Sequence, residues 1–216
     1  MAETEIIMGN VMDYLEWRGD LTFDQSPFND VDNVILSQLA YVNFRDVIPS
    51  VQMNKGITLK AAAQLFFDLH TEEELMQDKS FIKDAPKLLK KAAQTNRFRD
   101  VILSDYVDMV DETLEKQFGA FHIKLSPQCT YVAFRGTDDT LVGWKEDFNM
   151  SFISPVPSQE DAVKYLDDTC SYIRGSCMWA AIPKVAILQY IRLYTVVKGS
   201  ERKYSVYTIM TDRVLI

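Results

Sequence analysis

The chain has 216 residues, of which 47% are hydrophobic and 25% are charged, a globular composition that excludes a collagen and a disordered chain. Its formal net charge of −8 argues against general binding to nucleic acid, because that binding requires a basic face. Without an apolar run of membrane-spanning length, and with acidic residues where a secretory signal is basic, the sequence predicts a cytoplasmic protein with no transmembrane segment.

Four amphipathic helices are predicted in the first part of the chain. Apolar residues recur at helical spacing over 31–42, which predicts the first of them. The inner face of the second helix is expected to consist of Leu59, Ala62, Leu65, Phe66 and Leu69. Capping residues and a first-turn proline place the helix starts at Asn29 or Asp30, at Thr58, at Thr71 with Glu74, and at Pro86.

Strands and one further helix are predicted after these helices. The expected strands cover 101–103, 121–125 and 130–134, with a turn at 126–129 that joins the last two into a hairpin. Ser158 is expected to cap a helix that ends near Gly175. A helix-rich first part followed by strand, loop and helix favours the α/β fold class.

The segment best suited to chemistry is the end of the strand at 130–134, which continues into Arg135, Gly136 and Thr137. The glycine allows a sharp turn, so the N–H and the hydroxyl of Thr137 can point at a ligand. Donors in such a place stabilise the oxyanion that develops in acyl transfer. The alternative is that Arg135 is an ion-paired residue at a strand end and that Thr137 only forms a turn.

Two motifs in this region, A-F-R-G-T-D-D-T at 133–140 and G-W-K-E-D-F at 143–148, resemble the segment of class 3 lipases that runs from the oxyanion strand into the next helix. Residues 11–175 as a whole resemble a bacterial α/β-hydrolase-like family of unknown function. The resemblance implies an incomplete α/β-hydrolase-like fold with a helical N-terminal part, formed by residues 1–175. It implies Thr137 as an oxyanion-hole donor, with Arg135 and Asp147 holding the loop.

The resemblance also requires a G-x-S-x-G nucleophile elbow followed by a histidine, and the 216 residues contain no such elbow. The two histidines precede the expected elbow: His70 falls near a helix end and His122 on the outer face of a strand, so a surface or structural role is favoured for both. Intact relatives are expected to hydrolyse small ester or lipid-like substrates by a serine mechanism. This chain is expected to be inactive, because its catalytic nucleophile is absent.

No cofactor or metal site is predicted. The three cysteines include no C-x-x-C pair, and the resemblance implies no organic cofactor. Asp138, Asp139 and Asp147 offer oxygen ligands for a divalent cation, but they lack the spacing of a calcium loop. A second function class remains open, in which the chain is a non-catalytic interaction module whose acidic surface binds a basic protein.

The charge changes sign near the end of the chain. Residues 176–216 contain six basic and two acidic residues, whereas residues 1–175 contain 17 basic and 29 acidic residues. Permitted codons allow the start of this tail to be read, one base out of phase, as K-L-Y-V-G-G-H-S-K-G-G-N-L-A-V-Y. Met178 and Trp179 have one codon each and force Val-Gly in that frame, directly before the elbow G-H-S-K-G.

We therefore expect residues 176–216 to be out-of-frame translation that follows a one-base slip near residues 174–175. The loss of the elbow strand is then expected to leave the sheet without its middle. The alternative is a genuine β-hairpin around residues 199–200, where alternating residues flank a Gly-Ser turn.

Overall fold

A computed structural model describes residues 10–50, 55–77, 84–111, 113, 116–135, 157–170, 176–182 and 204–206. The helices are α1 (Val11–Arg18), α2 (Asp30–Leu39), α3 (Leu59–Leu69), α4 (Glu72–Gln77), α5 (Ala85–Ala92) and α7 (Pro157–Cys170). The strands are β1 (Ile57–Thr58), β2 (Ile102–Asp111), β3 (Lys116–Ser126), β4 (Cys129–Arg135), β5 (Ser176–Ile182) and β6 (Tyr204–Val206).

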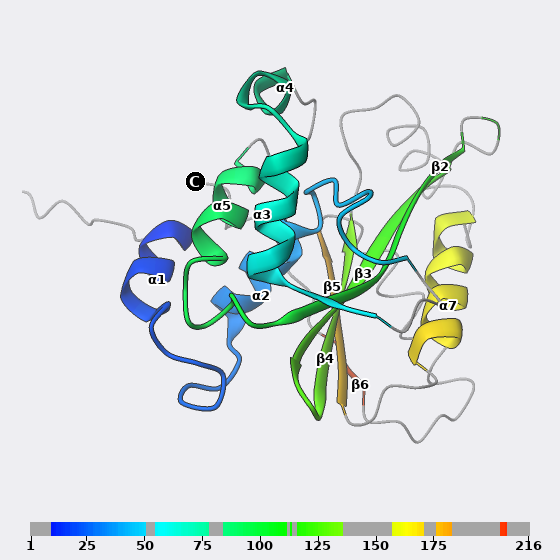
Figure 1. The fold of residues 1–216 in the computed structure, drawn as a ribbon. Coiled ribbons are helices and arrows are strands. Elements are labelled where there is room, and N and C mark those ends of the chain that lie inside the picture. The colour runs from blue at the N-terminus through cyan, green and yellow to red at the C-terminus, as the bar shows by residue number, and fades with distance from the viewer. Residues whose placement is uncertain are drawn as a thin grey trace, which may run out of the picture.

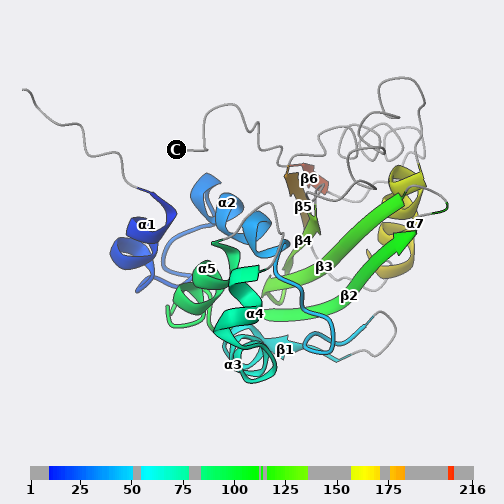
Figure 2. The same ribbon diagram turned by 90° about the horizontal axis from the view of Figure 1, so that it is seen from above.

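One mixed sheet organises these elements, in the order β1-β2-β3-β4-β5-β6. The pairs from β1 to β4 are antiparallel, whereas β4 pairs with β5, and β5 with β6, in parallel. Helices α2, α3 and α5 lie on one side of the sheet and α7 on the other (Figure 1). The view from above shows α1 outside α2 and α5 (Figure 2). The predicted α/β class is confirmed at this level.

The predicted helix starts agree with the structure where a capping residue is present. The Asn29 side chain caps α2, and Thr58 caps α3. Thr71 and Glu74 form the reciprocal bonds of a capping box, with N···O distances of 2.9 and 3.3 Å. Helix α7 begins at Pro157, so the predicted cap Ser158 lies inside its first turn.

The larger core lies between the sheet and the helices on the α2 side. Phe44 packs against Phe66 and Phe121, with ring centroids 6.1 and 5.5 Å apart. Tyr131 of β4 donates a 2.8 Å hydrogen bond to Asn33 of α2, so this buried hydroxyl is satisfied and ties the helix to the sheet.

The inner face predicted for α3 is only partly correct. Ala62 and Phe66 are buried, but Leu65 is 37% and Leu69 is 51% exposed. The apolar stripe of α3 is wider than the face that its neighbours cover, and helical spacing alone does not show where that cover ends.

Of the two roles predicted for His122, surface or structural, the surface role is wrong, because the residue is only 2% exposed beneath α7. Alternation separates the two faces of a strand but does not show which of them is covered. Helix α7 packs on the second face of the sheet, where Tyr165 contacts Phe118 and Phe134. Both faces of β3 and β4 are therefore buried.

The expectation that the sheet lacks a strand after α7 is also wrong. Residues 176–182 form β5, paired along the whole length of β4 from Cys129 opposite Ser176 to Arg135 opposite Ile182. Cys177 and Met178 are buried, and Met178 joins the core on the α2 side. The sequence C-M-W-A-A-I is apolar and short, which suits a strand buried on both faces.

Candidate functional site

The carboxyl edge of the parallel strands β4 and β5 is the place where the fold would position a site. Helix α7 connects these strands in the chain, and Arg135 and Ile182 stand opposite each other at their ends. In open α/β sheets, ligands bind outside the carboxyl ends of parallel strands. The chain therefore leaves β4 towards Gly136 and Thr137 next to the place where it leaves β5.

Thr137, the predicted oxyanion-hole donor, lies outside the described residues. The same holds for Asp138, Asp139 and Asp147, the acidic residues considered as cation ligands. The described part of the site is the strand end directly before these residues in the sequence, and its central side chain is Arg135.

Arg135 of β4 is anchored by a carboxylate from β2, which lies on the far side of β3 in the sheet. Its Nη2 donates to Oδ1 of Asp108 in β2, and the two side chains are only 12% and 8% exposed. Nη2 of Arg45 lies 3.5 Å from the other oxygen, Asp108 Oδ2. Asp108 therefore bridges two guanidinium groups, one largely buried and one on the surface, and this pairing fixes the Arg135 side chain at the end of β4.

The room for the Arg135 side chain comes from Gly119, its partner in the β3–β4 register. A Cβ added at Gly119 would lie 3.2 Å from both Cβ and Nε of Arg135. The guanidinium therefore packs directly over the glycine. A side chain at position 119 would displace Arg135 from Asp108 or bend the hairpin.

Tyr106 lies beside this ion pair. Its hydroxyl is 3.4 Å from Oδ1 of Asn43 and 3.5 Å from Oδ2 of Asp108. Burial, and then the negative charge of Asp108, raise the pKa of Tyr106 well above its usual value. The phenol therefore stays protonated at neutral pH and serves as a hydrogen-bond donor, not as a base.

A second polar cluster under α7 contains an acid, an imidazole and a hydroxyl. Nε2 of His122 lies 3.0 Å from Oγ1 of Thr169, and Nδ1 lies 3.6 Å from Oδ2 of Asp105. The Thr169 hydroxyl donates to the backbone carbonyl of Tyr165 at 2.6 Å, so the imidazole donates through Nε2 and Thr169 accepts. A nucleophile needs the opposite arrangement, with the base accepting the hydroxyl proton.

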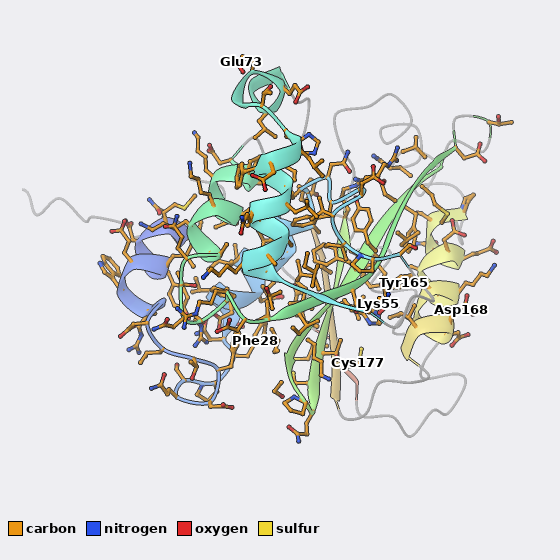
Figure 3. The ribbon with its side chains drawn as sticks, in the orientation of Figure 1. Phe28, Lys55, Glu73, Tyr165, Asp168 and Cys177 are labelled. Carbon is orange, nitrogen blue, oxygen red and sulfur yellow. The ribbon has the colours of Figure 1, made fainter. Side chains whose placement is uncertain are left out.

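The burial of this cluster also assigns it a structural role. His122 is 2% exposed and Thr169 is fully buried, so no substrate reaches them. Tyr165 points from α7 into the sheet while Asp168 points away (Figure 3), and the Tyr165 hydroxyl donates to the Asp105 carbonyl at 2.8 Å. Asp105 has a φ of 57° at a register shift in β2. The cluster holds α7 on this irregular part of the sheet.

The sequence patterns did not reveal a buried ion pair between Asp32 and Arg97. Both side chains are 0% exposed, with Nη2 and Oδ2 2.5 Å apart. Arg97 also donates to the carbonyls of Leu21, Ser26 and Pro27, at 3.1 Å each. These bonds close the loop between α1 and α2. Nothing local in the sequence indicated this pair, because its two residues are 65 positions apart.

A family model named Mbeg1-like matches residues 92–187, from the last residue of α5 through β5. The matched range therefore includes the whole β4–α7–β5 unit and continues past Gly175. No curated protein and no solved structure matches the chain.

Within the described ranges, no group of three or more His, Cys, Asp or Glu side chains is arranged to hold a metal ion. In the same part of the chain, no helix is both long enough and apolar enough to span a membrane.

Proposed function

We propose that the chain is a lipase-like α/β-hydrolase scaffold that lacks its catalytic nucleophile. The observation that carries the proposal is the β4–α7–β5 unit, in which A-F-R ends one parallel strand, directly before G-T in the sequence, beside the end of the next strand. A serine hydrolase of this class needs that juxtaposition, because an oxyanion donor from one strand end must face a nucleophile on the turn after the other. The Mbeg1-like match over the same unit is consistent with this lineage.

In an active relative, the serine hydroxyl would attack the ester carbonyl while a histidine takes its proton. The residue at the position of Thr137 would donate to the oxyanion that forms, and the Arg135–Asp108 pair would hold the donor loop in place. Ester or lipid-like small molecules are therefore the proposed substrate class of the lineage.

The residues after β5 explain why this chain is proposed to be inactive. Residues 183–194 contain no Ser, Thr or Cys, so the turn that should present the nucleophile carries none. Neither histidine serves as the base. His122 is buried against Thr169, and the ring of His70 packs on that of Phe66, with ring centroids 4.7 Å apart.

The decisive experiment restores the shifted frame by one base near codons 174–175 and measures hydrolysis of short p-nitrophenyl esters. The restored protein should turn over these esters, whereas the present chain should not exceed the rate with buffer. The matched control replaces the serine of G-H-S-K-G with alanine in the restored protein. An inactive but folded restored protein would overturn the proposal and favour the interaction module.

The origin of residues 176–216 has its own test, independent of catalysis. DNA sequencing across codons 170–180 should reveal an extra or missing base relative to an open frame that encodes the elbow. An uninterrupted frame that encodes only this tail in independent isolates would show that β5 belongs to the protein by descent, and the out-of-frame proposal would be wrong.

A further inference from the structure

A groove of about 390 Å³ lies between α3 and α5, apart from the carboxyl edge of β4 and β5. Small side chains make its floor: Ala63 is 5% and Ala93 is 7% exposed, so the two helices leave a channel where larger residues would have filled it. Phe67 adds an aromatic surface to the floor, because it is partly buried and packs edge-on against Phe66 with ring centroids 5.2 Å apart.

Three basic side chains surround this floor, on a chain whose formal charge is −8. The backbones of Lys60 and Arg99 lie side by side, because the Lys60 N–H donates a 3.0 Å hydrogen bond to the Arg99 carbonyl. Lys90 comes from α5, and its Nζ lies 5.8 Å from the centroid of the Phe67 ring. The cations therefore converge on the apolar floor from both walls.

The positive charge of the groove is only weakly neutralised within the protein. In the described part of the chain, neither Lys60 nor Lys90 has a carboxylate within ion-pair distance, whereas Lys87 and Lys91 of the same region do. Arg99 pairs with Asp100 at 3.1 Å, but both side chains are exposed, so solvent screens this pair and an incoming anion competes with it.

We infer that this groove binds a phosphomonoester that carries a short apolar group. Gln64 and Gln94 also line the groove and add amide donors, so lysines, guanidinium and amides surround one space. A phosphoryl group suits this set because its three oxygens accept several charge-assisted hydrogen bonds. The apolar group would cover the exposed part of the Phe67 ring, which water otherwise contacts.

The phosphomonoester chemistry has two sources, a soluble small molecule or the headgroup of phosphatidic acid in a bilayer. Both present the same dianion next to hydrocarbon. The site stands on the groove alone and does not depend on whether the chain descends from a hydrolase.

The test is calorimetric titration of the full chain with hexyl phosphate, with inorganic phosphate as the comparison ligand. Hexyl phosphate should bind, more tightly than inorganic phosphate, and added salt should weaken both interactions. The double variant Lys60→Gln/Lys90→Gln should bind about tenfold more weakly, because two partly exposed ion pairs are lost. The control Lys87→Gln/Lys124→Gln makes the same change in net charge outside the groove and should bind like the parent.

Absence of binding at millimolar hexyl phosphate, or equal losses in the two double variants, would overturn the inference. If Lys60→Gln/Lys90→Gln does not fold, as judged by its melting curve, Gln64→Glu/Gln94→Glu replaces it. This variant puts two negative charges in the groove and should abolish binding, and unchanged binding would again overturn the inference. Co-sedimentation with phosphatidic acid vesicles then separates the two sources. If the parent co-sediments and the groove variant does not, the ligand is the lipid headgroup. If the parent does not co-sediment, the ligand is a soluble molecule.

Discussion

The substitution Asp32→Asn tests the buried ion pair that fixes the loop between α1 and α2. The Asp32 carboxylate accepts Arg97 Nε at 2.6 Å, Arg97 Nη2 at 2.5 Å and the Tyr14 hydroxyl at 3.0 Å. An asparagine keeps the shape but leaves the guanidinium buried without an opposing charge. Removing one partner of a fully buried pair costs about 3–5 kcal/mol of unfolding free energy.

Urea unfolding followed by circular dichroism measures this loss. With a slope of about 2.5 kcal/mol/M for a chain of this size, the midpoint should fall by about 1.5 M. The control Asp84→Asn removes the charge from an exposed pair with Lys87, whose side chains are 78% and 69% exposed, and should cost less than about 1 kcal/mol. Equal shifts in the two variants would refute the reasoning.

A double-mutant cycle with Arg97→Gln isolates the pair from other effects of the substitutions. Asp32 and Arg97 share two hydrogen bonds. The double variant should therefore lose about 2 kcal/mol less unfolding free energy than the two single variants lose together. Additive losses would show that the two residues do not stabilise the fold through each other.

Three further predictions concern the sheet. Gly119→Val should lower the unfolding free energy by about 2–3 kcal/mol in urea titration, because its Cβ meets Arg135, and an unchanged midpoint would contradict the packing. Thr169→Val should cost about 1–3 kcal/mol, since it removes the acceptor of the buried His122 ring, and a loss no larger than that of an exposed Thr→Val variant would refute this role. Burial raises the pKa of Tyr106 and Tyr131 above the usual value near 10, so unfolding releases protons at high pH. Stability should therefore fall as the pH rises above about 10, and phenolate absorbance should show tyrosines that titrate later than the rest, Tyr106 and Tyr131 among them; titration of every tyrosine near pH 10 in the folded chain would contradict this.

Local signals in the sequence were sufficient for elements whose ends are set by neighbouring residues. Helices α2, α3 and α4 begin where Asn29, Thr58 and Thr71 cap them, because a cap depends on residues two or three positions away. Helix α1 was missed although Asn10 and Asp13 form the same kind of capping box. Its face is only weakly apolar, with Leu15 as the single buried residue of the helix, so helical spacing gave no signal.

The features that the sequence could not predict depend on packing between elements that are far apart in the chain. The extension of β2 to Asp111 runs through polar residues beyond a register shift, and it is set by pairing with β3. His122 looks like a surface residue until α7 is placed over it. Arg97 and Asp32 are far apart in the sequence, and only the packing of α5 against α2 makes them partners.

The candidate site was predictable as far as Arg135, whose position at a strand end before glycine suggested an ion pair. Its partner Asp108 could not be identified, because the segment after Leu103 gave no strand signal. Strand β5 shows the opposite difficulty. An apolar segment fits a buried strand whatever its origin, so the fold alone does not show whether residues 176–182 are encoded in the same reading frame as β4.

The most direct test of the central claim is intact-mass analysis after treatment with a fluorophosphonate, which adds covalently to an activated serine. The account predicts no adduct on the 216-residue chain and one adduct, on the serine of G-H-S-K-G, after the frame is restored. A stoichiometric serine adduct on the 216-residue chain itself would contradict it.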